Sequence, residues 1–128
     1  MTEQEMIKLV ERYFTAVDGE DFAVIASTLA ADCVFTVETH GIRLEGVEEI
    51  RGMFDRLWAD HAAVRHHDFT HIVAPGDGRV ASRFSVDNTL PDGGHVHKSN
   101  CNFFEIKDGR FSAVAVYMAG ENTLAGAS

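Results

Sequence analysis

The sequence has few of the features that mark membrane proteins or disulfide-bonded proteins. It contains only two cysteines, Cys33 and Cys101, which lie far apart and outside any C-x-x-C spacing. A disulfide framework or a thiolate zinc site therefore has no support, and we expect both thiols to be small buried hydrophobes. No uninterrupted apolar stretch approaches the roughly 20 residues that span a bilayer, and the start MTEQEMIKLV does not resemble a signal peptide. We expect a soluble, cytoplasmic protein with no membrane partner.

Basic residues are also scarce. The 11 Lys and Arg are outnumbered by 20 Asp and Glu, which gives a formal net charge of -9 at pH 7. This charge repels polyphosphate, and no cluster of Lys and Arg overrides it locally. We therefore expect no nucleic-acid partner.

Apolar residues, in contrast, are sufficient for one hydrophobic core. The chain has 128 residues, of which 45% are hydrophobic and 9 are Phe. Its length suits one domain, and no internal linker is visible. We expect a single domain over residues 1–128, with residues 120–128 as a loosely ordered tail.

The hydrophobic periodicity predicts helices in the first half of the chain and strands in the second. Apolar residues at 3/4 spacing predict helices over residues 3–17, 22–29 and 47–62, with Thr2 and Glu5 as a capping box for the first. Alternation predicts a short hairpin over residues 33–39 and 42–44. It then predicts four long strands separated by PGDG, PDGG and KDG turns, at residues 65–74, 79–90, 95–107 and 110–119.

This order predicts an α+β fold, in which a cone-shaped, strongly curved antiparallel β-sheet wraps around three N-terminal helices. The wide end of such a cone can leave a ligand pocket. Two registers are open across the PDGG turn, with Asn88 opposite either His97 or Lys98. We prefer the second, because it alone gathers the apolar residues of both strands on one face, namely Val80, Phe84, Val86, Phe104 and Ile106.

Polar residues are predicted to face this pocket. The PGDG turn places odd-numbered residues of strand 65–74 on the inner face, including His67 and His71. Together with Asn88, Asn100 and Asn102 they form a polar cluster, which burial would penalise unless each group finds a partner or a ligand. His66 would lie on the other face, at solvent or a subunit interface. On the last strand, either Tyr117 or Met118 faces inward.

The segments ERYFTAVDGEDF, LAADCVF, the helix after Gly46 and FFEIKDGRFSAVAVYMAGENTL resemble the nuclear transport factor 2-like superfamily, and within it the SnoaL-like proteins and ketosteroid isomerases. The resemblance covers nearly the whole chain and implies a fold better than a reaction. The similarity to ketosteroid isomerase implies Tyr13 and Asn102 as oxyanion donors. It puts Val37 where that family has its base, so a faithful ketosteroid isomerase is not expected.

Another branch, with scytalone dehydratase and hexachlorocyclohexane dehydrochlorinase, is similar over the run from His67 to His71. This resemblance implies His67 as the catalytic acid and base, with a partner Asp on the first helix. Residues 13–17 contain no such Asp, so an acceptor such as Asn100 or a backbone carbonyl would have to orient His67. The alternative is that His67 is a structural histidine with satisfied hydrogen bonds.

We expect no metal site and no cofactor. His67 and His71 lie about 13 Å apart on a strand, and His95 with His97 lacks an evident third ligand. The expected function is a cofactor-independent lyase or isomerase for a small hydrophobic carbonyl compound; the alternative is a non-catalytic binding protein for a hydrophobic metabolite. A homodimer through the outer sheet face is also expected. Predicted substrate contacts are His71, Asn100, Asn88, Trp58, Val37, Phe84, Phe54 and Met118.

Overall fold

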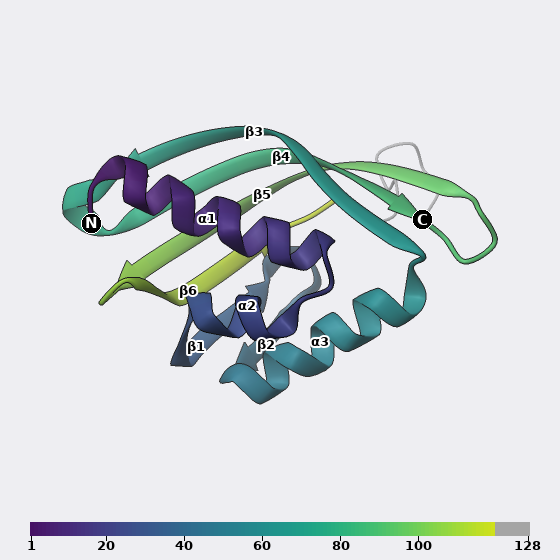
Figure 1. Ribbon diagram of the computed structural model, residues 1–128, viewed down its shortest axis with the longest axis horizontal. Coiled ribbons are helices and arrows are strands. Elements are labelled where there is room, and N and C mark those ends of the chain that lie inside the picture. The colour runs from purple at the N-terminus through teal and green to yellow at the C-terminus, as the bar shows by residue number, and fades with distance from the viewer. Residues whose placement is uncertain (120–128) are drawn as a thin grey trace.

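The computed structural model describes residues 1–119, and the predicted elements are present there in the predicted order (Figure 1). The helices are α1 (Glu3–Asp18), α2 (Phe22–Thr28) and α3 (Val47–Asp60). The strands are β1 (Leu29–Val37), β2 (Ile42–Glu45), β3 (Ala63–Ala74), β4 (Arg79–Thr89), β5 (His95–Lys107) and β6 (Arg110–Tyr117). The predicted loose tail at residues 120–128 lies outside the described residues.

The six strands form one curved sheet in the order β2-β1-β6-β5-β4-β3, and the helices cover its concave side (Figure 1). This arrangement confirms the α+β cone. One pairing differs from the predicted antiparallel pattern, because β1 runs parallel to β6, with Phe35 opposite Val114. Short turns dictate antiparallel neighbours from β3 to β6, whereas no turn connects β1 to β6, so the sequence pattern carried no information on their direction.

The helix α1 forms and packs as its sequence dictates. Thr2 Oγ1 accepts a hydrogen bond from the Glu5 backbone N–H at 3.1 Å, and Glu5 Oε1 accepts one from the Thr2 N–H at 2.8 Å. This reciprocal capping box satisfies two N–H groups at the helix start. The apolar face of α1 is buried against the sheet through Met6, Val10, Tyr13, Phe14 and Val17.

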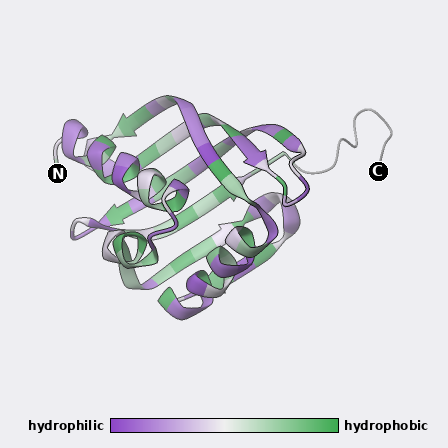
Figure 2. Ribbon diagram, turned by 45° about the vertical axis from the view of Figure 1, so that its right-hand side comes forward, coloured by the Kyte–Doolittle hydropathy of each residue, from purple (hydrophilic) through white to green (hydrophobic). Residues whose placement is uncertain are grey.

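The core fills the narrow part of the cone. Phe104, Phe111, Val80 and Val114 are buried there between the helices and the strands. The turn beyond β5 is tight, because Asp108 and Gly109 both have positive φ, the geometry of a two-residue type I′ hairpin. In Figure 2 the hydrophobic residues alternate with hydrophilic ones along the strands, as expected for a sheet with one covered face.

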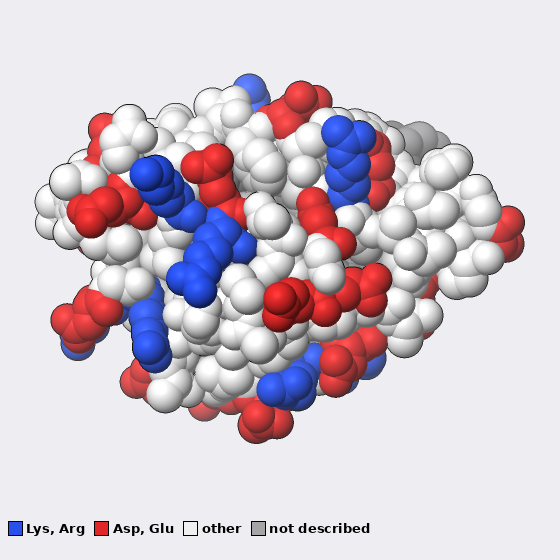
Figure 3. Space-filling view, in the orientation of Figure 1, with Lys and Arg blue, Asp and Glu red and all other residues white. Residues whose placement is uncertain are grey.

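The convex face of the sheet exposes large apolar side chains as well as charges. Ile72, Phe103 and Tyr117 are exposed, and Phe103 packs edge to face on Tyr117 at 5.8 Å between ring centroids. The predicted homodimer would use this face and stays a prediction. On the helical side of the molecule, acidic and basic side chains are interspersed (Figure 3). No helix within residues 1–119 is long and apolar enough to span a bilayer.

Candidate functional site

A cavity of about 320 Å³ lies between the concave face of the sheet and helices α1 and α3. Most of its lining is apolar, which is typical of small-molecule sites. Asp and Glu are absent from the lining contributed by residues 1–119. The polar residues that line it are Tyr13, His40, His61, His66, Asn88, Lys98, Asn100 and Asn102.

A β-bulge in β3 decides which histidine enters this cavity. His71 pairs with Ser82 and Thr70 with Arg83, but beyond the bulge the register shifts by one and His66 pairs with Val86. Asp68, within the bulge, has φ of 57°, a left-handed conformation rare for residues with a side chain. One extra residue exchanges the two faces of a strand.

The exchange reverses the predicted roles of two neighbouring histidines. His66, expected on the outside, lines the cavity. His67, expected inside, points to the outer face, where Nε2 contacts Asp87 Oδ2 at 2.6 Å. The predicted inward orientation of His67 is therefore wrong, because strict alternation was assumed through a strand that contains a bulge.

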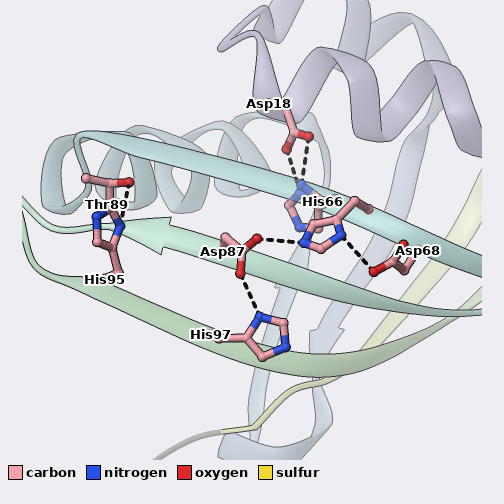
Figure 4. A network of polar contacts seen from close by, with 8 residues as sticks. Asp18, His66, Asp68, Asp87, Thr89, His95 and His97 are labelled. Carbon is pink, nitrogen blue, oxygen red and sulfur yellow. Dashed lines mark hydrogen bonds and ion pairs between the residues drawn. The ribbon is translucent and has the colours of Figure 1, made fainter.

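His66 forms a pair with Asp18, at the end of α1 (Figure 4). Its ring Nδ1 lies 2.6 Å from Asp18 Oδ1, and its backbone N–H donates to Asp18 Oδ2 at 2.8 Å. The carboxylate thus accepts from the ring Nδ1–H, which fixes the tautomer and leaves Nε2 as the basic nitrogen. The His66 side chain is only 11% exposed, and its ring packs against Phe14 and Phe84.

The position of Asp18 is unfavourable without its partner. A negative charge in the last turn of a helix faces the negative end of the helix dipole. The two hydrogen bonds from His66 offset this penalty and hold the imidazole against α1. Residues 13–17 contain no Asp, as noted above. The first helix nevertheless carries a carboxylate one residue later, at Asp18.

The predicted polar cluster on β4 and β5 is present, in a register different from both alternatives. Phe84 pairs with Asn100 and Ser82 with Asn102. Neither predicted pairing of Asn88 occurs, because it lies opposite Val96. The loop runs from Leu90 to Gly94, one residue more than the four residues of PDGG, and is closed by the hydrogen bond from the Leu90 N–H to the Gly94 carbonyl at 2.7 Å. The preferred register nevertheless gave the correct inner face, because a shift of two preserves the alternation.

Three asparagines and one tyrosine bring hydrogen-bonding groups to the cavity. Asn88 Oδ1 and Asn102 Oδ1 are buried without a partner among residues 1–119, which costs about 1–3 kcal/mol per group. Asn100 Oδ1 accepts from the Ala119 N–H at 3.0 Å. Burial, together with the neighbouring Cys33, raises the pKa of Tyr13, so its phenol stays protonated and can donate.

The other predicted contacts divide into two groups. Val37, Phe54, Phe84 and Met118 line the cavity, and Met118 rather than Tyr117 is thus the inward residue of the last segment. Trp58 and His71 do not line it. Trp58 stacks behind Phe54 and donates its Nε1–H to the Val17 carbonyl at 3.1 Å. His71 Nδ1 contacts the buried hydroxyl of Ser82 at 2.7 Å, deeper in the cone.

Besides His66, which was expected on the outer face, sequence reasoning missed four polar residues of this site: Asp18, His40, His61 and Lys98. Lys98 could have been predicted, because it lies two residues before Asn100 on β5 and therefore shares its inner face. His61 and His40 occur in the connections after α3 and β1, where no periodicity places a side chain. The His61 Nδ1–H donates to the Leu57 carbonyl at 2.8 Å.

The fold and its internal cavity define a helix-capped conical sheet of the nuclear transport factor 2-like class. The chain belongs to the SnoaL-like domain family, whose model matches residues 10–114. A search of the curated proteins finds no match.

Solved structures share the fold at low sequence identity. A candidate polyketide cyclase from Xanthomonas campestris pv. campestris superposes with a TM-score of 0.86 at 20% identity, over 98% of both chains. Another from Silicibacter sp. TM1040 gives 0.83 at 18% identity, over 100% of this chain and 98% of that chain. TerC, co-crystallised with polyporic acid, gives 0.80 at 16% identity over 95% of each chain.

Proposed function

We propose that this protein is a cofactor-independent lyase or isomerase that acts on a small hydrophobic carbonyl compound, with His66 as its acid and base. One observation carries the proposal: His66, paired with Asp18, lines a mostly apolar cavity that Tyr13 and Asn102 also line. A shielded base beside hydrogen-bond donors is what enolisation requires.

The chemistry follows from the tautomer that Asp18 imposes. The free Nε2 of His66 takes a proton from the carbon next to the substrate carbonyl, and the electron pair moves onto the carbonyl oxygen as an enolate. Tyr13 and Asn102 can each donate a hydrogen bond to that oxygen. The imidazolium, stabilised by Asp18, then returns the proton to another carbon in an isomerisation or to a departing hydroxyl in a dehydration.

Two further observations support this class of reaction. The resemblance to the dehydratase branch implied a histidine with an Asp partner on the first helix, and Asp18 with His66 supplies that combination. Two structures of the same fold are described as candidate polyketide cyclases, and TerC was co-crystallised with polyporic acid. That the present chain acts on a small molecule of this kind is part of the proposal.

The test is deuterium exchange of 1-tetralone in D₂O, followed by proton NMR, because exchange reports enolisation whatever the physiological product is. Wild-type protein should accelerate exchange at the carbon next to the carbonyl. His66→Gln should reduce that acceleration by about 10²- to 10⁴-fold, the usual contribution of a general base. His67→Gln, on the outer face, is the matched control and should exchange as the wild type does. Equal exchange by His66→Gln and the wild type would remove His66 from the reaction.

A second candidate function is the binding of a hydrophobic metabolite without conversion. Val37 favours it, because this apolar side chain lines the cavity where the ketosteroid isomerase resemblance places a base. The same experiment separates the two functions. Binding of 1-tetralone, seen as a shift of its NMR signals, with exchange no faster than in buffer would support the binding protein.

A further inference from the structure

A second cluster of histidines and carboxylates lies on the opposite face of the sheet from the cavity. Asp87 on β4 contacts a histidine on each neighbouring strand: Oδ2 lies 2.6 Å from His67 Nε2, and Oδ1 lies 2.6 Å from His97 Nδ1 (Figure 4). The three potential ligand atoms of His67, Asp87 and His97 all lie within 4.8 Å of one another. The proposed acid and base chemistry uses none of these residues.

The ligand types and their access suit a metal ion. Two imidazoles and one carboxylate are ligands for zinc and its neighbours in the first transition row. The side chains are 25%, 45% and 61% exposed for His67, Asp87 and His97, so an ion can enter from solvent and keep water in its remaining positions. The formal net charge of -9 also favours a cation.

We propose that His67, Asp87 and His97 form a binding site for a divalent transition metal ion of the zinc class, which joins β3, β4 and β5 on the outer face of the sheet. Ligand atoms bound tetrahedrally at about 2.0–2.1 Å are separated by about 3.3 Å. This value lies between the 2.6 Å from each histidine nitrogen to Asp87 and the 4.8 Å within which all three ligand atoms lie. Small side-chain rotations therefore suffice for an ion to replace the protons between the rings and the carboxylate.

Asp68 provides the outer carboxylate that metal-binding histidines usually have. Its Oδ2 lies 2.9 Å from His67 Nδ1, the ring nitrogen that faces away from Asp87. A carboxylate there keeps the proton on Nδ1 and directs the lone pair of Nε2 toward the ion. The bulge that turns His67 outward also places Asp68 beside it, through its positive φ of 57°.

The two histidines converge on one carboxylate, because His67 reaches one oxygen of Asp87 and His97 the other. The two imidazole rings lie 6.4 Å apart between centroids and share that one carboxylate. Arg65, opposite Asp87 on β3, forms no ion pair with it among the described residues.

Isothermal titration of Zn²⁺ into the EDTA-treated, dialysed full chain tests the proposal. Wild type should bind one equivalent, and both His67→Gln and His97→Gln should weaken the affinity at least tenfold. His95→Gln is the matched control, since His95 is exposed on the same strand as His97 and its ring has a hydrogen bond only with Thr89 among the described residues. Circular dichroism without metal should show that all three variants are folded.

The visible spectrum of bound Co²⁺ reports the metal ligands directly and does not depend on the stability of the variants. Co²⁺ should give visible ligand-field bands with the wild type, and His67→Gln and His97→Gln should lose them. His66→Gln, which removes the proposed base, should bind Zn²⁺ like the wild type, so failure of the proposed function leaves this test unaffected. Absence of one-equivalent binding, unchanged affinity in both His67→Gln and His97→Gln, or loss of binding in His95→Gln would overturn the site.

Discussion

Asp18 and His66 lie 48 positions apart, yet Asp18 Oδ1 is 2.6 Å from His66 Nδ1, and the same carboxylate accepts the His66 backbone N–H. The double contact ties the end of α1 to β3 immediately before its bulge. It also determines which ring nitrogen is free, and so links the packing of a helix to the proposed chemistry of the cavity.

The first prediction concerns the charge of this pair. Asp18→Asn keeps the shape of the side chain but removes the negative charge that stabilises the imidazolium. We expect the turnover number for 1-tetralone exchange to fall about 10- to 100-fold, less than the full value of a general base, with little change in KM. Asp60→Asn, at the exposed end of α3, is the control. A fall in kcat/KM caused by KM alone would instead indicate a role in ligand binding.

The positive charge of Lys98 leads us to predict that the cavity prefers acidic ligands. It lines a cavity to which residues 1–119 contribute no Asp or Glu. We expect 2-naphthoate to bind about three- to fivefold more tightly than neutral 2-naphthamide, as a partly exposed ion pair contributes up to about 1 kcal/mol. Lys98→Met should abolish the difference in Kd measured by fluorescence, and Lys107→Met should retain it. Equal binding of the two ligands by the wild type would contradict the prediction.

Two phenylalanines on β5 and β6 should differ sharply in their contribution to stability. Phe111 is 0% exposed and packs on Phe104 at 4.6 Å between ring centroids. Its replacement by Ala leaves a core cavity, which typically costs about 3–5 kcal/mol. Measured on the monomer at low protein concentration, Phe103→Ala, at a side chain that is 52% exposed in the single chain, should cost less than about 1 kcal/mol. Urea denaturation followed by circular dichroism measures both values.

The outer face of the sheet predicts the state of assembly. Phe103 and Tyr117 form an exposed aromatic pair, with exposed Ile72 on β3 of the same sheet. We expect a homodimer that buries the aromatic pair, and Phe103→Asp should shift it toward monomer because the charge would be desolvated at the interface. Sedimentation equilibrium measures the shift. A wild type that stays monomeric at all concentrations would contradict this expectation.

The burial of His71 should make the free energy of unfolding depend on pH. Burial lowers its pKa below the ordinary value of 6.5, and the charge of Glu11 on α1 partly opposes this. The unfolded chain then binds more protons than the folded one between the two pKa values, so stability contributed by neutral His71 is present above pH 6.5 and decreases as the pH falls. His71→Gln should flatten the decrease in unfolding free energy between pH 7 and 5. His95→Gln, at an exposed site, should retain it.

The elements were predictable because periodicity reports burial. Several helix and strand boundaries follow from a capping residue or a turn, as at Thr2 and the Asp108–Gly109 turn. The start of β1 was predicted wrongly, because this strand begins at Leu29, directly after α2, and not at Cys33. The parallel pairing of β1 with β6 was not predictable, since it depends on packing between segments far apart in the chain.

The candidate site was predicted only in part, because the bulge in β3 could not be recognised from the sequence. The apolar lining and the asparagines followed from alternation, which survives a register shift of two residues. The histidines did not, because Asp68 adds one residue to β3 and carries no composition signal of a bulge. A glycine at that position would have suggested the positive φ; an aspartate does so only weakly.

The bulge at Asp68 also has an evolutionary consequence. Residues 66 and 67 carry the same side chain, yet losing the codon for residue 68 would not exchange them: the strand would become regular, with His66 still opposite Val86 and His67 still opposite Ser85. Relatives one residue shorter here would therefore keep one imidazole toward a substrate and the other toward solvent, without the bulge.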